Sequence, residues 1–203
     1  TVCKAVAPGT SASSVRAVLA GNELTTEGPD GDSWMAYVIV RAPRGATLDV
    51  FSANGPISIS RFHWTLTAAA SNGPVSVKDS TGTITARTTN GPVSIAGGSG
   101  NVRLDATNGP VSVRLSGLSW DGSLEASTRN GSLSLKLPRG FRSGVVVESD
   151  GNGPVTCRAE GCPEVKAHRW EQENRPRRIQ LGHGPSVSCP STVNGPVSVK
   201  ESE

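Results

Sequence analysis

The stretch Asn72-Gly-Pro-Val-Ser-Val77 decides the fold of this chain, because its pattern recurs along most of the sequence. The first four copies follow one another at intervals of 18 residues, and the next two follow at intervals of 22. Self-similarity at a fixed period is the signature of a repeat architecture. The seven copies begin at Asn54, Asn72, Asn90, Asn108, Asn130, Asn152 and Asn194.

Each copy combines a sharp turn with the start of a strand. Asn tolerates, and Gly freely adopts, the left-handed backbone conformations that a tight turn needs. Pro then fixes φ at the first position of a strand, where its missing N–H does least harm. The next three residues alternate in polarity, so Val75 and Val77 are expected to point to one side and Ser76 to the other.

A second alternating segment precedes each turn. Mostly apolar or small residues stand six, four and two positions before the Asn in five successive copies. They are Leu48, Val50 and Ser52; Leu66, Ala68 and Ala70; Ile84, Ala86 and Thr88; Val102, Leu104 and Ala106; and Leu124, Ala126 and Thr128. One coil of two strands cannot bury its apolar side alone, whereas stacked coils share a narrow core.

The sequence therefore predicts an all-β solenoid (β-helix) with 18–22 residues and two strands per coil. A three-sided helix with six residues per side is the competing architecture for an 18-residue period. Counted from Val75, that helix would place Thr81 and Arg87 in its interior, so we prefer the two-strand coil.

The repeat divides the chain into parts. Residues 1–34 lack the turn motif and are expected to form an N-terminal cap or extension, followed by solenoid coils over residues 35–158. Residues 159–178 are predicted to form an inserted loop, and residues 179–203 to form the C-terminal coils.

Composition and charge argue against several classes of function. No run of 18 apolar residues spans a membrane, and a net charge of +3 is weaker than nucleic-acid binding usually requires. The acids Asp49, Asp79, Asp105 and Glu125 fall in different columns, whereas glycoside hydrolysis needs two carboxylates at one spot. We therefore predict a protein that is not an enzyme and uses no cofactor.

The cysteines indicate an oxidising compartment, because they form an even set of four. We expect a local disulfide between Cys157 and Cys162. A zinc site that adds His168 and Cys189 is the alternative, although the Cys-x4-Cys spacing is looser than usual. The chain starts at Thr1, as a mature secreted product would after removal of its signal.

The remaining cysteines, Cys3 and Cys189, lie near opposite ends of the sequence, and a simple stack keeps them too far apart for a bond within one molecule. Either residues 1–20 run back along the stack, or Cys3 of one copy bonds to Cys189 of the next. We favour the second case, in which terminal coils stack head to tail into a filament, a homopolymer of this chain.

Three columns of side chains are candidate sites. The turn asparagines at the seven motif positions are expected to form a structural ladder of hydrogen-bonded amides. An outward row of hydroxyls is expected to face solvent at steps of about 4.8 Å, and consists of Ser58, Ser76, Ser94, Ser112, Ser134, Thr156 and Ser198. A basic column suits solubility and edge protection or, alternatively, binding of acidic polysaccharide. It consists of Lys78, Arg114, Lys136, Arg158 and Lys200.

The chain resembles a bacterial adhesin-like family of secreted β-solenoid proteins, whose motif is Thr-x-Asn-Gly-x-[Val/Ile]-x-[Val/Ile]. The resemblance rests on Thr89-Asn-Gly-Pro-Val-Ser-Ile95, on Thr107-Asn-Gly-Pro-Val-Ser-Val113 and on Ala42-Pro-Arg-Gly45. The segments 178–185 and 192–199 match the C-terminal signature of that family, so the resemblance covers residues 34–200. The cysteines are not part of this motif.

This resemblance implies a right-handed, single-chain solenoid at the cell envelope. We therefore expect a secreted, cell-surface structural or adhesin-like protein that associates with itself and has surface glycans or other envelope components as further candidate partners. A monomeric carbohydrate- or partner-binding module is the alternative, and a polysaccharide-active β-helix enzyme is less favoured.

Overall fold

In the part of the chain that it describes, the computed structural model is all-β with one short 3₁₀ helix, η1 (Ala12–Ser14). Contacts divide it into two compact units, Thr1–Pro43 and Arg44–Glu203. The structure describes residues 2–6, 11–30, 34–149, 153–162, 177–189 and 192–202.

The first unit contains two antiparallel strand pairs. Strand β1 (Val2–Val6) pairs with β4 (Trp34–Val38), and β2 (Arg16–Ala20) pairs with β3 (Glu23–Glu27). The segment that forms β4 was predicted within the range of the solenoid coils, but it belongs to this unit. The first solenoid strand begins at Thr47.

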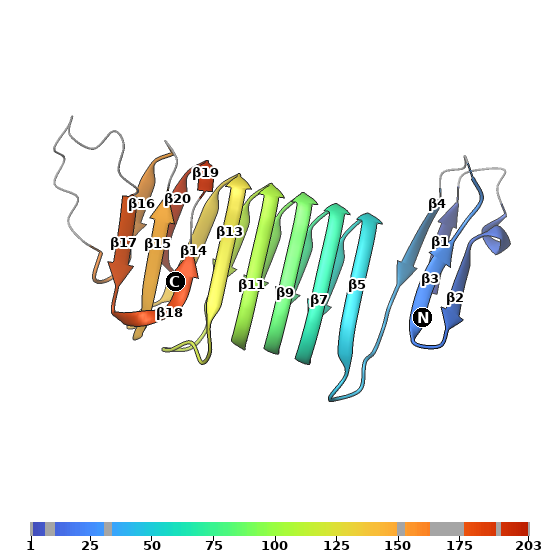
Figure 1. Cartoon of the computed structure of the whole chain (residues 1–203), viewed down its shortest axis with the longest axis horizontal. Coiled ribbons are helices and arrows are strands. Elements are labelled where there is room, and N and C mark those ends of the chain that lie inside the picture. Colours follow the sequence, from blue (N-terminus) through green and yellow to red (C-terminus); the bar gives the residue numbers. More distant parts are fainter. Residues whose placement is uncertain are drawn as a thin grey trace. The chain divides into compact units, whose positions relative to one another are not determined.

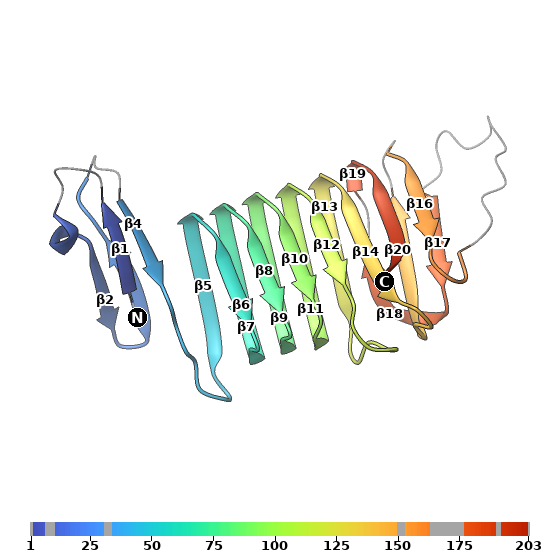
Figure 2. The same cartoon turned by 180° about the vertical axis from the view of Figure 1, so that it is seen from behind.

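The second unit is a β-solenoid in which each coil adds one strand to each of two sheets (Figures 1 and 2). We name these the long-strand sheet and the short-strand sheet. Five consecutive coils supply the long strands β5 (Thr47–Asn54), β7 (His63–Asn72), β9 (Thr81–Asn90), β11 (Ser99–Asn108) and β13 (Leu124–Asn130). Their short strands are β6 (Ile57–Ser60), β8 (Val75–Lys78), β10 (Val93–Ala96), β12 (Val111–Arg114) and β14 (Leu133–Pro138).

Within these coils the strands are parallel and in register at offsets of 18 or 22 residues, which confirms the predicted two-strand coil. Val75 and Val77 expose at most 1% of their surface, as the alternation predicted. The predicted inward threonines Thr88 and Thr128 are also buried, and each donates a hydrogen bond from Oγ1 to a turn carbonyl. These bonds offset the cost of burying a hydroxyl.

The later coils do not stack in chain order. In the short-strand sheet, β20 (Val197–Ser202) lies between β14 and β16 (Val155–Arg158), as Figure 2 shows. In the long-strand sheet, β18 (His183–Cys189) lies between β13 and β15 (Ser143–Ser149). The C-terminal coil is therefore inserted one position inside the end of the stack.

Two further strands complete this end of the long-strand sheet. The short β19 (Thr192–Asn194) pairs with β13 in parallel. Strand β17 (Arg177–Leu181) pairs with β15 in the antiparallel direction and is the last strand of the sheet. The structure describes the predicted loop 159–178 only at its two ends, residues 159–162 and 177–178.

The turn glycines are needed because successive turns stack backbone on backbone. Gly91 has φ of +152°, and a Cβ atom at this position would overlap the carbonyl oxygen of Gly73 in the preceding coil. The same contact repeats at each corner, and it places Gly195 over Gly131 and Gly153 over Gly195. The glycine column thus follows the same spatial order as the strands.

We predict that Gly91→Ala lowers the free energy of unfolding by roughly 2–4 kcal/mol, because a methyl group cannot fit without moving the neighbouring coil. Denaturant unfolding measures the effect. Gly45→Ala is the matched control, since Gly45 also has a positive φ (+86°) but has nothing within 4 Å of its Cβ position. An equal loss in both variants would show that backbone conformation alone, and not stacking, requires the glycine.

Candidate functional site

The turn asparagines form a hydrogen-bonded column at one corner of the solenoid. Each Nδ2 donates to the Oδ1 of the asparagine in the neighbouring coil, over distances of 2.8–3.0 Å. Asn194 donates directly to Asn130, because the C-terminal coil is its neighbour in space. Asn152 lies outside the described residues. The column runs through Asn54, Asn72, Asn90, Asn108, Asn130 and Asn194.

The outer face of the short-strand sheet carries the predicted hydroxyl row. Strand register aligns its members from coil to coil, and Ser94 Oγ donates to Ser76 Oγ at 3.2 Å. Ser198 belongs to the same row, between Ser134 and Thr156. Small polar side chains therefore line one continuous track along the sheet.

Beside this track lies the predicted basic column, in an order that differs from the sequence. Register places the column positions in the spatial order Ser60, Lys78, Ala96, Arg114, Lys136, Lys200, Arg158. Inserting β20 thus brings four cations onto four successive strands, while Ala96 separates Lys78 from them. We call Arg114, Lys136, Lys200 and Arg158 the basic row.

The charges of the basic row have no carboxylate partner among the described residues. The salt bridges in the described part of the chain, with N···O distances of 4.0 Å or less, all involve residues outside the basic row. Lys136 is half-buried and the other three cations are exposed. Because neighbouring strands lie about 4.8 Å apart, the cations are stacked close to one another.

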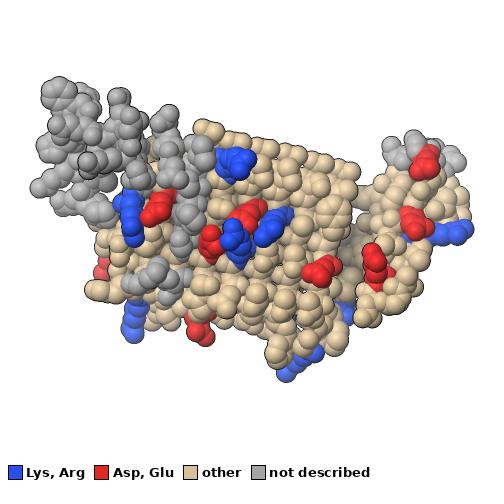
Figure 3. Space-filling model, in the orientation of Figure 1, with Lys and Arg blue, Asp and Glu red and all other residues tan. Residues whose placement is uncertain are grey.

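The outer face of the long-strand sheet carries a network of opposite charges instead. Asp105 Oδ2 lies 2.9 Å from Arg103 Nε and 3.5 Å from Arg87 Nε, and Arg103 Nη1 lies 3.0 Å from Glu125 Oε2. Ser127 Oγ donates to Asp105 Oδ1 at 2.6 Å. Figure 3 shows these acidic and basic side chains gathered in the middle of the face.

The hydrogen bond to Asp105, with the negative charges of Asp105 and Glu125, raises the pKa of Arg103 above its ordinary value. The network joins three neighbouring strands on their solvent side, because Arg87 lies on β9, Arg103 and Asp105 on β11, and Glu125 on β13. Sequence reasoning placed Asp105 and Glu125 in unrelated columns and missed the network. The signal was present in the spacing, because Asp105 follows Arg87 by 18 residues and Glu125 follows Arg103 by 22, which are the two coil lengths.

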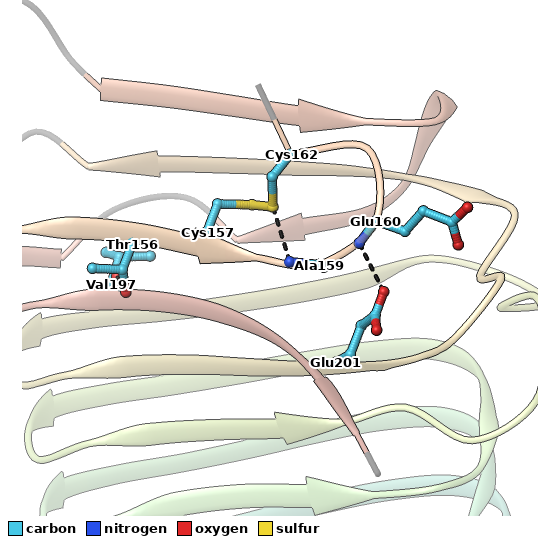
Figure 4. Close-up of a disulfide and its surroundings, with 7 residues drawn as sticks. All are labelled: Thr156, Cys157, Ala159, Glu160, Cys162, Val197 and Glu201. Carbon is cyan, nitrogen blue, oxygen red and sulfur yellow. Dashed lines mark hydrogen bonds between the residues drawn. A yellow bond between two sulfur atoms is a disulfide. The ribbon is translucent and has the colours of Figure 1, made fainter. Parts of the chain in front are cut away.

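The predicted local disulfide is present between Cys157 and Cys162, whose Cα atoms lie 5.8 Å apart (Figure 4). It closes a short turn after β16, in which Ala159 N donates to Cys162 Sγ. Glu160 N donates to Glu201 Oε1 at 2.8 Å, which ties this turn to β20. The disulfide thus stabilises the coil at the end of the stack.

The disulfide removes two ligands from the alternative zinc site, since bonded sulfurs are not available as thiolates. His168, its third ligand, lies outside the described residues. The backbone of Cys3 lies in β1, and that of Cys189 lies in β18 opposite Val147, between β13 and β15. A bond between Cys3 and Cys189 stays a prediction.

No protein-family model, curated protein or solved structure matches this chain. The described part of the chain contains no helix with the length and apolar character needed to cross a membrane. The structure establishes a β-solenoid of about five turns, and the likeness to an adhesin-like family stays a resemblance of motifs.

We predict that Asn108→Ala destabilises the protein by about 1–2 kcal/mol, because it breaks the amide bonds to both neighbouring coils. Thermal or denaturant unfolding measures the loss. Asn54→Ala is the matched control, because among the described residues Asn54 has an amide partner on one side only. Its loss should be about half as large, and identical losses would argue against an amide ladder that contributes coil by coil.

Proposed function

We propose that this chain is a non-enzymatic, extracellular scaffold, an adhesin-like β-solenoid of the bacterial cell surface. The observation that carries the proposal is the in-register stack. Outward positions of the motif align from coil to coil, so that a continuous row of serines runs along the sheet through Ser76, Ser94, Ser112, Ser134 and Ser198. Such rows suit the display of an extended surface better than they suit a single reacting point.

The disulfide supports the extracellular part of the proposal. Stable disulfides persist in oxidising compartments and are rare in the cytosol of most organisms. Cys157 and Cys162 close the turn that follows β16, at the end of the short-strand sheet. A covalent closure at this point protects the coil of β16, which among the described strands pairs in the short-strand sheet with β20 only. The motif resemblance supports the adhesin-like part, including the right-handed coil direction that it implies.

For self-assembly, the arrangement of strands favours single solenoids over head-to-tail filaments. Strand β17 runs antiparallel along the outermost position of the long-strand sheet, where the parallel coil of a second copy would have to pair. An antiparallel strand at this edge disfavours pairing with a parallel coil of a second copy. Cys189 also lies on β18, which β15 and β17 separate from the edge of the sheet. We therefore favour a monomeric surface module over the filament that the cysteines suggested.

The proposal predicts that antibodies label the protein on intact cells that produce it, without lysis. Cysteine alkylation and mass spectrometry of the isolated protein should find Cys157 and Cys162 joined. On a non-reducing gel the protein should run as a single monomer band. Labelling that requires lysis would overturn the extracellular assignment, and a ladder that collapses with reductant would restore the intersubunit Cys3–Cys189 bond.

A further inference from the structure

The basic row is the feature of the solenoid that its folding does not explain. Arg114, Lys136, Lys200 and Arg158 occupy four successive strands of the short-strand sheet, each directly opposite the next in register. Like charges directly opposite one another on neighbouring strands are destabilising. The row becomes continuous only because the C-terminal coil enters the stack between β14 and β16.

The other face of the same coils shows that this arrangement is not forced by the fold. On the long-strand sheet, Arg103 pairs with Asp105 and Glu125, and Arg87 pairs with Asp105, so charges on neighbouring strands attract. On the short-strand sheet the neighbouring charges repel, and no carboxylate of the described residues lies within 4.0 Å of them. A ligand with regularly spaced negative charge would relieve this repulsion.

We propose that the basic row binds a linear acidic polysaccharide, which lies along the stacking direction of the solenoid. A row of cations on successive strands, about 4.8 Å apart, complements an extended hexuronate chain, because such a chain carries one carboxylate on every sugar unit. In the adjacent hydroxyl row, the exposed hydroxyls of Ser112 and Thr156 are available to sugar hydroxyls next to the charges, whereas Ser198 Oγ is buried. Beyond Arg114 the same column continues with the small Ala96 and then with a further cation, Lys78.

The composition of this face favours a glycan over a single-stranded nucleic acid. Proteins that bind single strands stack the bases on aromatic side chains. The described outward positions of the short strands are Ser, Thr, Lys, Arg, Ala and Pro, without an aromatic residue. The inference rests on the proposed extracellular setting, in which such polysaccharides are found.

The test measures binding of the full chain to polygalacturonate, to a neutral galactan of similar length and to duplex DNA, by titration calorimetry at low and high salt. We expect binding to polygalacturonate that weakens as salt rises, because exposed charges are screened. Neutral galactan should not bind, and DNA should bind at least ten-fold more weakly than polygalacturonate.

The decisive variant is Lys200→Glu, which places a carboxylate between Lys136 and Arg158. It should weaken polygalacturonate binding by about ten-fold and raise Tm by roughly 2 °C, because repulsion becomes attraction. A gain in stability excludes misfolding as the reason for the lost affinity. Arg129→Glu is the matched control, since it makes the same change in net charge at an exposed position of β13 on the long-strand sheet, and its affinity should stay within about two-fold of the parent.

The inference is overturned if polygalacturonate does not bind, if DNA binds as tightly, or if Arg129→Glu loses as much affinity as Lys200→Glu. The last result would show an effect of net charge without a site. These outcomes are distinct from failure of the proposed function. If antibodies label the protein on intact cells but polygalacturonate does not bind, only the assignment of the ligand is wrong.

Discussion

The fold depends on how closely successive Asn-Gly corners approach one another. At each corner the glycine of one coil lies against the carbonyl group of the glycine below it, at a separation that leaves no room for a Cβ atom. The neighbouring asparagine joins the same two coils through its amide. Because both contacts repeat at every step, they set the register of the strands on either side, and the valines and leucines that follow are brought over one another in the core.

This corner also explains why the stack tolerates a coil out of chain order. The short strands that follow the described corners share the same inward pattern, so the C-terminal strand β20 can pair with β14 as well as with β16. Val197 pairs with Leu133 on one side and with Val155 on the other. The inserted coil changes the surface more than the core, because it fills a gap in the basic row with Lys200. The strand order at the C-terminal end thus determines the charge pattern on the outer face of the short-strand sheet.

Much of the fold could be predicted from the sequence, because the period of the motif and its alternation are local features. The inward residues, the two strands per coil and the amide column follow from the spacing of the motif. The Cys157–Cys162 bond was expected from the short separation and the even number of cysteines, with a zinc site as the alternative. The order of the last coils could not be predicted, because the motifs are so similar that the sequence does not indicate which strand pairs with which. The ion-pair network of Arg87, Arg103, Asp105 and Glu125 was missed because the acidic residues were compared only with one another, whereas they pair with arginines of neighbouring coils.

The outer faces of the two sheets therefore differ in how their charges are arranged. The long-strand face contributes to the stability of the stack through paired charges. On the short-strand face the basic row lies beside a row of hydroxyls and has no carboxylate partner among the residues that the structure describes. A scaffold that displays one such face needs coils that remain in register over its length, which the corner contacts provide.

Backbone nuclear Overhauser effects in a solution NMR spectrum of the full chain test the stacking account most directly. The account predicts contacts from the amide and α protons of Val197 to those near Leu133 and also to those near Val155, with no direct contact between β14 and β16. Direct contacts between β14 and β16, or corner residues that show no contacts to the neighbouring corner, would contradict it.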